Sequence, residues 1–495
     1  MKDKRDESYG HVLKYTGIFG GVQGLNILIG LVRNKIVASL LGPSGMGLAS
    51  LFNTTVNFIS QATNFGISFS AVRHVSELFD QGDEERITRF VKVVRAWSLL
   101  TALLGMLVCV ALGPLLSDFT FSWGDHTLHF VLLAPAVGLM AVTGGETAIL
   151  KGARQLRSLA VIQVWNVLLA LVVAVPLYYY FRQSAIVPVI VLMALMAMLL
   201  TIRYSYRLYP LRLSGAKGVL GEGMEMIRLG VAFVLAGILG SGAEMFIRSY
   251  LNIVADLDMV GLYNAGFMLI VTYGGMVFSA METDYFPRVS AVARHRKKMR
   301  DTVNRQIEVS LLIVAPMLVG LIVFMPIVIP LLFTRDFMPV VGMAQVAVFA
   351  MYIKAVSLPI SYLTLARGDS MAYLVIEAAD DVLLVLFMVA GYTHWELLGT
   401  GFALVAFYLV DFIIVYAYTY LRYGYCFSLL VMQYVAIQFP LGLAAYIVTF
   451  VDRPFIYWTL GCLLCFVSLA VSIHVLRQKT SLWDALTRKY LSKLH

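Results

Sequence analysis

The chain has 495 residues, of which 60% are hydrophobic and only 14% are charged, and its mean hydropathy is +0.82. A soluble domain typically carries about 25% charged residues, so this composition excludes a soluble protein or a secreted enzyme. The formal net charge of +9 does not indicate a nucleic-acid partner, because the basic residues lie in short loops between apolar segments. In such loops they set membrane orientation.

Apolar segments long enough to cross a bilayer recur from one end of the chain to the other. A membrane-spanning helix needs about 20 mostly apolar residues. By this criterion the sequence predicts an all-α polytopic membrane protein with about 14 transmembrane helices. In chain order, the predicted spans are 13–41, 46–72, 93–116, 128–150, 159–181, 185–204, 226–252, 259–286, 309–333, 341–365, 372–391, 397–421, 429–451 and 455–476.

Loops rich in Lys and Arg alternate with loops that carry few positive charges. Positively charged loops stay in the cytoplasm, so the alternation predicts that both termini are cytoplasmic. The tail at 479–495 places apolar residues at helical spacing with basic residues between them, which is typical of an amphipathic helix at a membrane surface. The main basic clusters lie at 73–95, 151–157, 203–217 and 288–305.

A weak internal repeat divides the chain. Residues 45–48 (Gly-Met-Gly-Leu) open the second span, and residues 259–262 (Met-Val-Gly-Leu) open the eighth in the same way. A repeat of six spans keeps its orientation in the membrane, and transporters built from such repeats hold the substrate at the interface of the two halves. We predict two pseudo-symmetric six-helix bundles, two additional transmembrane helices and the tail. Their ranges are 1–217, 218–424, 425–478 and 479–495.

The N-terminal part of the chain carries a family likeness. It contains Tyr-Thr-Gly at 15–17, Arg-Asn-Lys-Ile-Val at 33–37 and Leu-Leu-Gly-Pro-Ser-Gly-Met-Gly-Leu at 40–48. These motifs, with the six-plus-six layout and two extra C-terminal helices, resemble Wzx-type O-antigen and polysaccharide flippases of the multidrug/oligosaccharidyl-lipid/polysaccharide (MOP) exporter superfamily. The second turn, Asp-Leu-Asp-Met at 256–259, departs from the Leu-Gly-Pro form, which leaves the equivalence of the two turns open.

The resemblance implies a transporter and not an enzyme. Such a flippase moves undecaprenyl-diphosphate-linked oligosaccharide units from the cytoplasmic to the periplasmic leaflet of the bacterial inner membrane by alternating access. Its product serves lipopolysaccharide O-antigen or another surface polysaccharide. The implied partners are the lipid-linked glycan, membrane lipids and the polysaccharide polymerase machinery. No cofactor is implied, although transport could be coupled to a proton or sodium gradient.

Five ionisable residues lie near the middle of predicted spans. An ionisable side chain at the centre of a transmembrane helix costs about 2.5 to 3.5 kcal/mol, so such residues face the protein interior or a wet cavity. Glu377, Asp380 and Asp381 share one helix face, and we expect that face to turn toward Lys354, Asp411 or water. Two interpretations compete: a structural ion-pair cluster, or an ion-coupling site for protons or sodium.

Cations inside the spans are candidates for binding the substrate diphosphate. Arginine can bind phosphate oxygens through two hydrogen bonds. The sequence offers Arg33, Lys35 and Arg248 for this role, together with Lys354 near the midplane. The competing interpretation is that these side chains reach the membrane surface or form local ion pairs, such as Arg248 with Glu244 one turn away. Glu244 is also a candidate coupling residue. No catalytic or metal-binding residue is predicted.

Three other functions fit parts of the sequence. A multidrug or cation antiporter of the same superfamily needs an acidic cavity, whereas the first half carries Arg33 and Lys35. A lipid II flippase has the same architecture. A membrane glycosyltransferase or polymerase is the alternative from another class, but its DxD-like string, 256–258, lies in a short turn without a catalytic domain.

Overall fold

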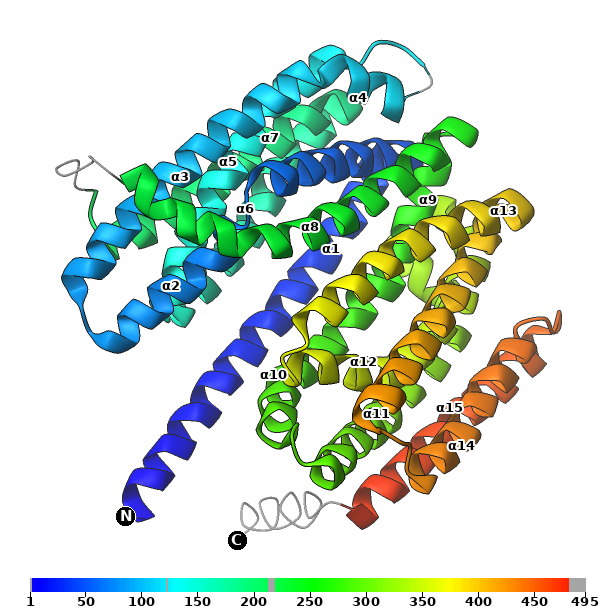
Figure 1. Ribbon diagram of the computed structural model, residues 1–495. Helices are drawn as coiled ribbons and strands as arrows, with labels where there is room; N and C mark the ends of the chain where they lie inside the picture. Colours follow the sequence, from blue (N-terminus) through cyan, green and yellow to red (C-terminus); the bar gives the residue numbers. More distant parts are fainter. Residues whose placement is uncertain (1, 122, 212–218, 480–495) are drawn as a thin grey trace, which may run out of the picture. The chain divides into compact units, whose positions relative to one another are not determined.

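The computed structural model describes residues 2–121, 123–211 and 219–479, and within these ranges the chain is helical, without β-strands (Figure 1). The predicted amphipathic tail, apart from its first residue, lies outside the described residues. The chain forms two compact units, the first comprising Met1–Gly261 with Leu332–Thr334 and the second comprising Leu262–Leu331 with Arg335–His495. The repeat-based division into four ranges stays a prediction.

In the first unit, α5 packs against α2, α3 and α7, and α1 packs against α6 and α8. These contacts bury apolar side chains of α2, α3 and α5 in a common cluster that includes Ile67, Val91, Trp97 and Ile149. The helices of this unit are α1 (Lys2–Thr63), α2 (Ile67–Gln81), α3 (Glu84–Ala111), α4 (Gly113–Thr120), α5 (Thr127–Gly152), α6 (Leu156–Phe181), the 3₁₀ helix η1 (Arg182–Ala185), α7 (Ile186–Leu208), α8 (Val219–Val254) and the beginning of α9 (Leu257–Phe267).

In the second unit, α12 packs along both parts of α13, and α14 runs beside α15 (Figure 1). Buried polar groups join the last two helices, because the Gln438 amide bonds to Ser468 and Ser472. The elements are the π-helical segment η2 (Met268–Tyr273), α10 (Gly274–Val292), α11 (Arg296–Leu332), the 3₁₀ helix η3 (Arg335–Phe337), α12 (Val340–Ala366), α13 (Ser370–Tyr423), α14 (Leu429–Val448) and α15 (Pro454–Lys479).

Two of the long helices are each a pair of spans joined at a sharp break. α1 breaks at Gly42, whose backbone has φ 65° and ψ −173°, and Pro43 follows it. α13 breaks at Trp395 and Glu396, where Glu396 has φ 49°. Among the described residues, nine helical stretches are long and apolar enough to cross a membrane, and two of these, Leu156–Leu208 and Ser370–Tyr423, each cover two predicted spans. The prediction of a polytopic all-α membrane protein is confirmed.

The structure differs from the predicted spans in two places. The predicted span 46–72 ends early, because Phe65 (φ 49°) and Gly66 (φ 71°) adopt the left-handed conformation that stops α1 and starts the separate helix α2. The predicted span 93–116 is also interrupted, since α3 ends at Ala111 and α4 begins with Gly113 and a proline in its first turn. Hydropathy alone does not locate such breaks, because the residues on both sides remain apolar.

Candidate functional site

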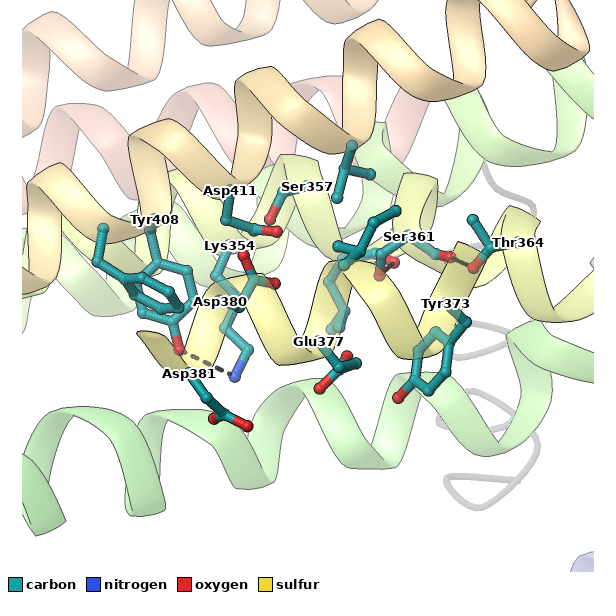
Figure 2. A pocket seen from close by; sticks show the side chains of 14 residues that line it. Lys354, Ser357, Ser361, Thr364, Tyr373, Glu377, Asp380, Asp381, Tyr408 and Asp411 are labelled. Atoms are coloured by element: carbon teal, nitrogen blue, oxygen red, sulfur yellow. Dashed lines mark hydrogen bonds between the residues drawn. The ribbon is translucent and has the colours of Figure 1, made fainter. Parts of the chain in front are cut away.

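A polar cavity of about 220 Å3 lies in the second unit between α12 and the two parts of α13 (Figure 2). The break in α13 creates it by folding the second part of that helix back along the first. Gly391 and Gly399 allow the return, since a Cβ atom on Gly391 would lie 2.4 Å from the Gly399 carbonyl oxygen. The polar residues that line the cavity are Lys354, Ser357, Ser361, Thr364, Tyr373, Glu377, Asp380, Asp381, Tyr408 and Asp411.

The cavity gathers all five of the midspan ionisable residues that the sequence singled out. Glu377, Asp380 and Asp381 come from the first part of α13, Asp411 from its second part, and Lys354 from α12. The sequence analysis missed the hydroxyl residues around them. Ser357, Ser361 and Thr364 follow Lys354 at intervals of three, four and three residues, so this polar stripe on one helix face was readable in the sequence.

The carboxyl groups crowd together within the cavity. Asp380 and Asp411 interact directly with each other, and Asp411 also interacts with the Ser357 hydroxyl group. One oxygen of Asp380, Oδ1, is buried without a hydrogen-bond partner in the described part of the chain. Two carboxyl groups in such contact are more stable when they share one proton or bind a cation. This pair therefore has the chemistry of a proton or cation site.

Lys354 supplies the positive charge that lines the same cavity. Its Nζ atom lies 3.5 Å from the Tyr408 hydroxyl oxygen and 5.6 Å from the centre of that ring. It also interacts electrostatically with Glu377 and Asp411. Four carboxyl groups against one ammonium group leave the cavity with an excess of acidic groups, which favours the binding of a cation over the binding of a diphosphate.

The first unit holds a second polar cavity of about 500 Å3. Residues of α1, α2, α5 and α8 line it, and most of them carry amide or hydroxyl groups. The sequence analysis did not predict this cavity. The lining residues are Thr54, Asn57, Ser60, Gln61, Asn64, Ser68, Met140, Gly237, Ser241 and Glu244. We call it the amide cavity.

The predicted cation Arg248 lies buried beside the amide cavity and is not among its lining residues. Its guanidinium donates to Ser50 Oγ at 2.9 Å, to the Glu244 carbonyl oxygen at 3.1 Å and to Glu244 Oε2 at 3.3 Å. The local ion pair that was the competing interpretation is therefore present. Glu244 keeps 47% of its side-chain surface exposed and lines the cavity. The role of Arg248 in binding a diphosphate stays a prediction.

The other two predicted cations belong to the first part of α1. Arg33 Nη2 donates to Asn34 Oδ1 at 3.4 Å, and the Arg33 charge acts on the Tyr178 hydroxyl group of α6. The Lys35 ammonium group donates to the Phe333 carbonyl oxygen. Neither residue lines the two polar cavities described above. Their function as diphosphate ligands also stays a prediction.

A buried ion pair in the first unit escaped the sequence analysis. Arg95 Nε donates to Glu146 Oε1 at 2.8 Å, and the two side chains keep only 9% and 3% of their surface exposed. The Arg95 guanidinium also donates to the Tyr209 carbonyl oxygen at 2.9 Å and lies 4.1 Å from the centre of the Tyr206 ring. The pair connects α3, α5 and α7. Glu146 is the one Asp, Glu, Lys or Arg residue in the predicted span 128–150. A single charged residue in an apolar span indicates a buried partner, so this signal was available in the sequence.

Comparisons with known proteins agree with this architecture. A family model described as "Polysaccharide biosynthesis protein" matches residues 36–342. No curated protein matches the sequence. A solved structure described as "Lipid II flippase MurJ, inward closed conformation" is similar with a TM-score of 0.74 and 11% identity, covering 93% of this chain and 99% of that one.

Two further solved structures share the fold. An inward-facing multidrug resistance MATE family transporter of the MOP superfamily is similar with a TM-score of 0.67 and 16% identity, covering 81% of this chain and 94% of that chain. A MOP superfamily transporter from Pyrococcus furiosus is similar with a TM-score of 0.59 and 15% identity, covering 83% and 94%. At such identities the likeness concerns the fold alone. The solved structures confirm the fold that the sequence-based resemblance implied.

Proposed function

This chain belongs to the polysaccharide biosynthesis protein family, and from that premise we propose that it is a flippase for undecaprenyl-diphosphate-linked oligosaccharides. It moves them from the cytoplasmic to the periplasmic leaflet of the bacterial inner membrane. Both termini are cytoplasmic, and transport proceeds by alternating access. The glycan serves O-antigen or another surface polysaccharide, and the polymerase machinery receives it on the outer side.

The observation that carries this proposal is the amide cavity of about 500 Å3 inside a unit of membrane-spanning helices. Polar groups inside such a unit are costly unless they serve a polar substrate or line a wet passage. Amide and hydroxyl side chains match the hydroxyl groups of a glycan, whereas they offer little to an apolar drug. A polar head that crosses the bilayer therefore has a place to be solvated by the protein.

The prenyl tail of the substrate requires an apolar surface. The second unit has a groove of about 510 Å3 between α11, α12, the second part of α13 and α14, and apolar side chains dominate its lining. Among them are Leu311, Val405, Phe412, Val431 and Phe439. We propose that this groove holds part of the prenyl chain, because its apolar side chains can pack against the hydrocarbon by van der Waals contact.

Coupling to an ion gradient is the second part of the proposal. The acidic cavity around Asp380 and Asp411 can hold a proton or a sodium ion, and its charge differs between the loaded and empty states. A group whose charge changes can bias a transporter between its two openings. This acidic cavity also favours one alternative, a cation antiporter, because organic cations bind acidic sites.

A transport assay separates these functions. The purified full chain is reconstituted into vesicles that contain either fluorescent prenyl-diphosphate-linked oligosaccharide or fluorescent lipid II. The label exposed on each leaflet and the uptake of an organic cation dye are measured with and without a pH gradient. Translocation of the lipid-linked oligosaccharide without uptake of an organic cation dye supports the proposal. Dye transport alone would establish the cation antiporter, and translocation restricted to lipid II would establish a lipid II flippase.

A further inference from the structure

The amide cavity presents hydrogen-bonding groups that no other described residue of the protein uses. The side chains of Asn57, Ser60 and Gln61 form no hydrogen bond within the described part of the chain. Asn64 donates to Ser68 Oγ at 2.7 Å, but its own Oδ1 atom is buried without a partner among the described residues. A buried acceptor without a partner costs about 1 to 3 kcal/mol, so Asn64 Oδ1 is suited to a ligand that donates. The amides of Asn57 and Gln61 are exposed, and each can both donate to and accept from a ligand in the cavity.

The amides form a stripe along one face of the helix. Thr54, Asn57, Gln61 and Asn64 follow one another at intervals of three, four and three residues, which places them on the same side of α1 and at its end. Ser241 and Gly237 of α8 face the same cavity, and a Cβ atom on Gly237 would lie 3.8 Å from the Gln61 amide. A methyl group at position 237 would therefore contact the Gln61 side chain, and glycine leaves that volume unfilled.

The amide cavity also contains an acidic group. Among its described lining residues, Glu244 is the ionisable one, and its carboxylate lines the cavity while also accepting from Arg248 at 3.3 Å. An adjoining cavity of about 310 Å3 shares Ser68 and Met140 and includes Lys151. Lys151 is exposed, so solvent screens its charge and weakens its pull on an acidic ligand.

We propose that the amide cavity binds the sugar residues of the substrate and selects glycans without acidic groups. This inference rests on the proposed flippase function and adds its substrate class: neutral or amino sugars. Their hydroxyl and N-acetyl groups can donate to Asn64 Oδ1 and accept from the amide groups of Asn57 and Gln61. A uronic acid would instead bring a second carboxylate beside Glu244, and like charges in a confined site repel each other.

Equilibrium binding to the purified full chain in lipid nanodiscs tests the inference. Three probes share one prenyl diphosphate: one carries N-acetylglucosamine, one carries glucuronic acid and one carries no sugar. The wild type is expected to bind the N-acetylglucosamine probe about tenfold more tightly than the glucuronic acid probe, the ratio that corresponds to about 1.4 kcal/mol.

Variants of the amide stripe provide the decisive comparison. Asn57→Ala and Gln61→Ala are each expected to weaken binding of the N-acetylglucosamine probe by about fivefold, the loss of about one hydrogen bond, and to leave the sugar-free probe unchanged. Asn53→Ala is the matched control. Asn53 is an exposed neighbour whose amide donates to the Ala49 carbonyl oxygen at 2.7 Å, and it does not line the cavity.

Glu244→Gln tests the charge argument separately. Removing the carboxylate should raise the affinity for the glucuronic acid probe by about tenfold, since the repulsion disappears and the Arg248 guanidinium loses an anionic partner. A thermal unfolding scan confirms that each variant is folded. The N-acetylglucosamine probe serves as the internal reference, because its affinity should change less than that of the acidic probe.

The outcomes separate this inference from the flippase proposal. If all three probes bind equally and the stripe variants change nothing, the sugar site is refuted while the flippase proposal stands. If the wild type binds the glucuronic acid probe more tightly than the N-acetylglucosamine probe, the proposed preference for glycans without acidic groups is wrong. If none of the prenyl diphosphates binds to folded protein, both the flippase proposal and the sugar site are rejected.

Discussion

Gly47 and Gly261 lie against each other's turns in the first compact unit. A Cβ atom on Gly47 would lie 2.1 Å from the Leu257 carbonyl oxygen, and one on Gly261 would lie 2.0 Å from the Pro43 carbonyl oxygen. These are the glycines of the two motifs that the internal repeat matched. The contact is reciprocal, as expected for two related turns packed back to back, although only the first contains the Gly-Pro sequence.

Gly47→Ala and Gly261→Ala should each disrupt this contact, because the added methyl group collides with backbone and not with a side chain that can rotate away. Such overpacking typically costs about 1 to 3 kcal/mol. We expect transport by each variant in the vesicle assay to fall by about tenfold or more. Gly30→Ala is the control, since nothing lies within 4 Å of a Cβ atom there. Full transport by Gly47→Ala would show that the turns can separate at no cost.

The acidic cavity yields a prediction about coupling. Asp380→Asn and Asp411→Asn each remove one carboxyl group of the interacting pair, so the pair can no longer exchange a shared proton or hold a cation. Transport by each variant should then be no faster with a pH or sodium gradient than without one. Movement of the lipid-linked glycan down its own concentration gradient should persist. The measurement is the initial flipping rate with and without the gradient.

Asp118→Asn is the matched control for the coupling variants, because Asp118 is an exposed carboxylate of α4 outside the acidic cavity. Its gradient dependence should equal that of the wild type. An unchanged gradient dependence in both Asp380→Asn and Asp411→Asn would assign the cluster a structural role.

The buried Arg95–Glu146 pair should matter for stability. Glu146→Ala leaves the Arg95 guanidinium buried without its carboxylate, and breaking a buried pair typically costs about 3 to 5 kcal/mol. Thermal unfolding of the purified protein in detergent measures the loss. The double variant Arg95→Met with Glu146→Leu should recover much of it, since neither charge then needs a partner.

An exposed ion pair of similar geometry provides the comparison for Glu146→Ala. Arg154 Nη2 lies 2.6 Å from Asp80 Oδ1, and the two side chains are 58% and 55% exposed. Asp80→Ala should therefore cost less than about 1 kcal/mol. Equal losses for Asp80→Ala and Glu146→Ala would contradict the argument that burial decides the energy of the pair.

Asp369, in the turn between α12 and α13, predicts a pH dependence. Hydrogen bonds from the Tyr418 hydroxyl group at 2.6 Å and the Tyr423 hydroxyl group at 3.1 Å favour its ionised form and lower the pKa of Asp369. A lowered folded-state pKa stabilises the protein above the unfolded pKa of about 3.9, and the benefit is lost as the pH falls through the folded-state pKa.

The unfolding temperature of the wild type should thus exceed that of Asp369→Asn at pH 7, and the difference should shrink as the pH falls below about 4. Tyr418→Phe should reduce the difference, because it removes the closer donor. A gap between wild type and Asp369→Asn that stays constant down to the lowest pH would rule out this titration as its source.

The sequence alone determined the membrane class and most of the long apolar helices, because the hydrocarbon interior demands such helices whatever the tertiary structure is. It also identified the ionisable residues that must turn away from lipid, including Lys354, Asp380 and Asp411. Charge in an apolar span is conspicuous in a single sequence. Because a charge that faces lipid is energetically costly, such a residue must face the protein interior or a polar cavity, and these residues line the acidic cavity.

Only the tertiary structure decided which polar groups meet. The break at Glu396 folds α13 back and brings Asp411 to Asp380, while the left-handed conformation of Phe65 ends α1 beside the amide cavity. Arg95 and Glu146 are 51 residues apart and meet only because α3 packs on α5. Hydropathy depends on composition along the chain, whereas these contacts depend on backbone turns and helix packing, which leave apolar content unchanged.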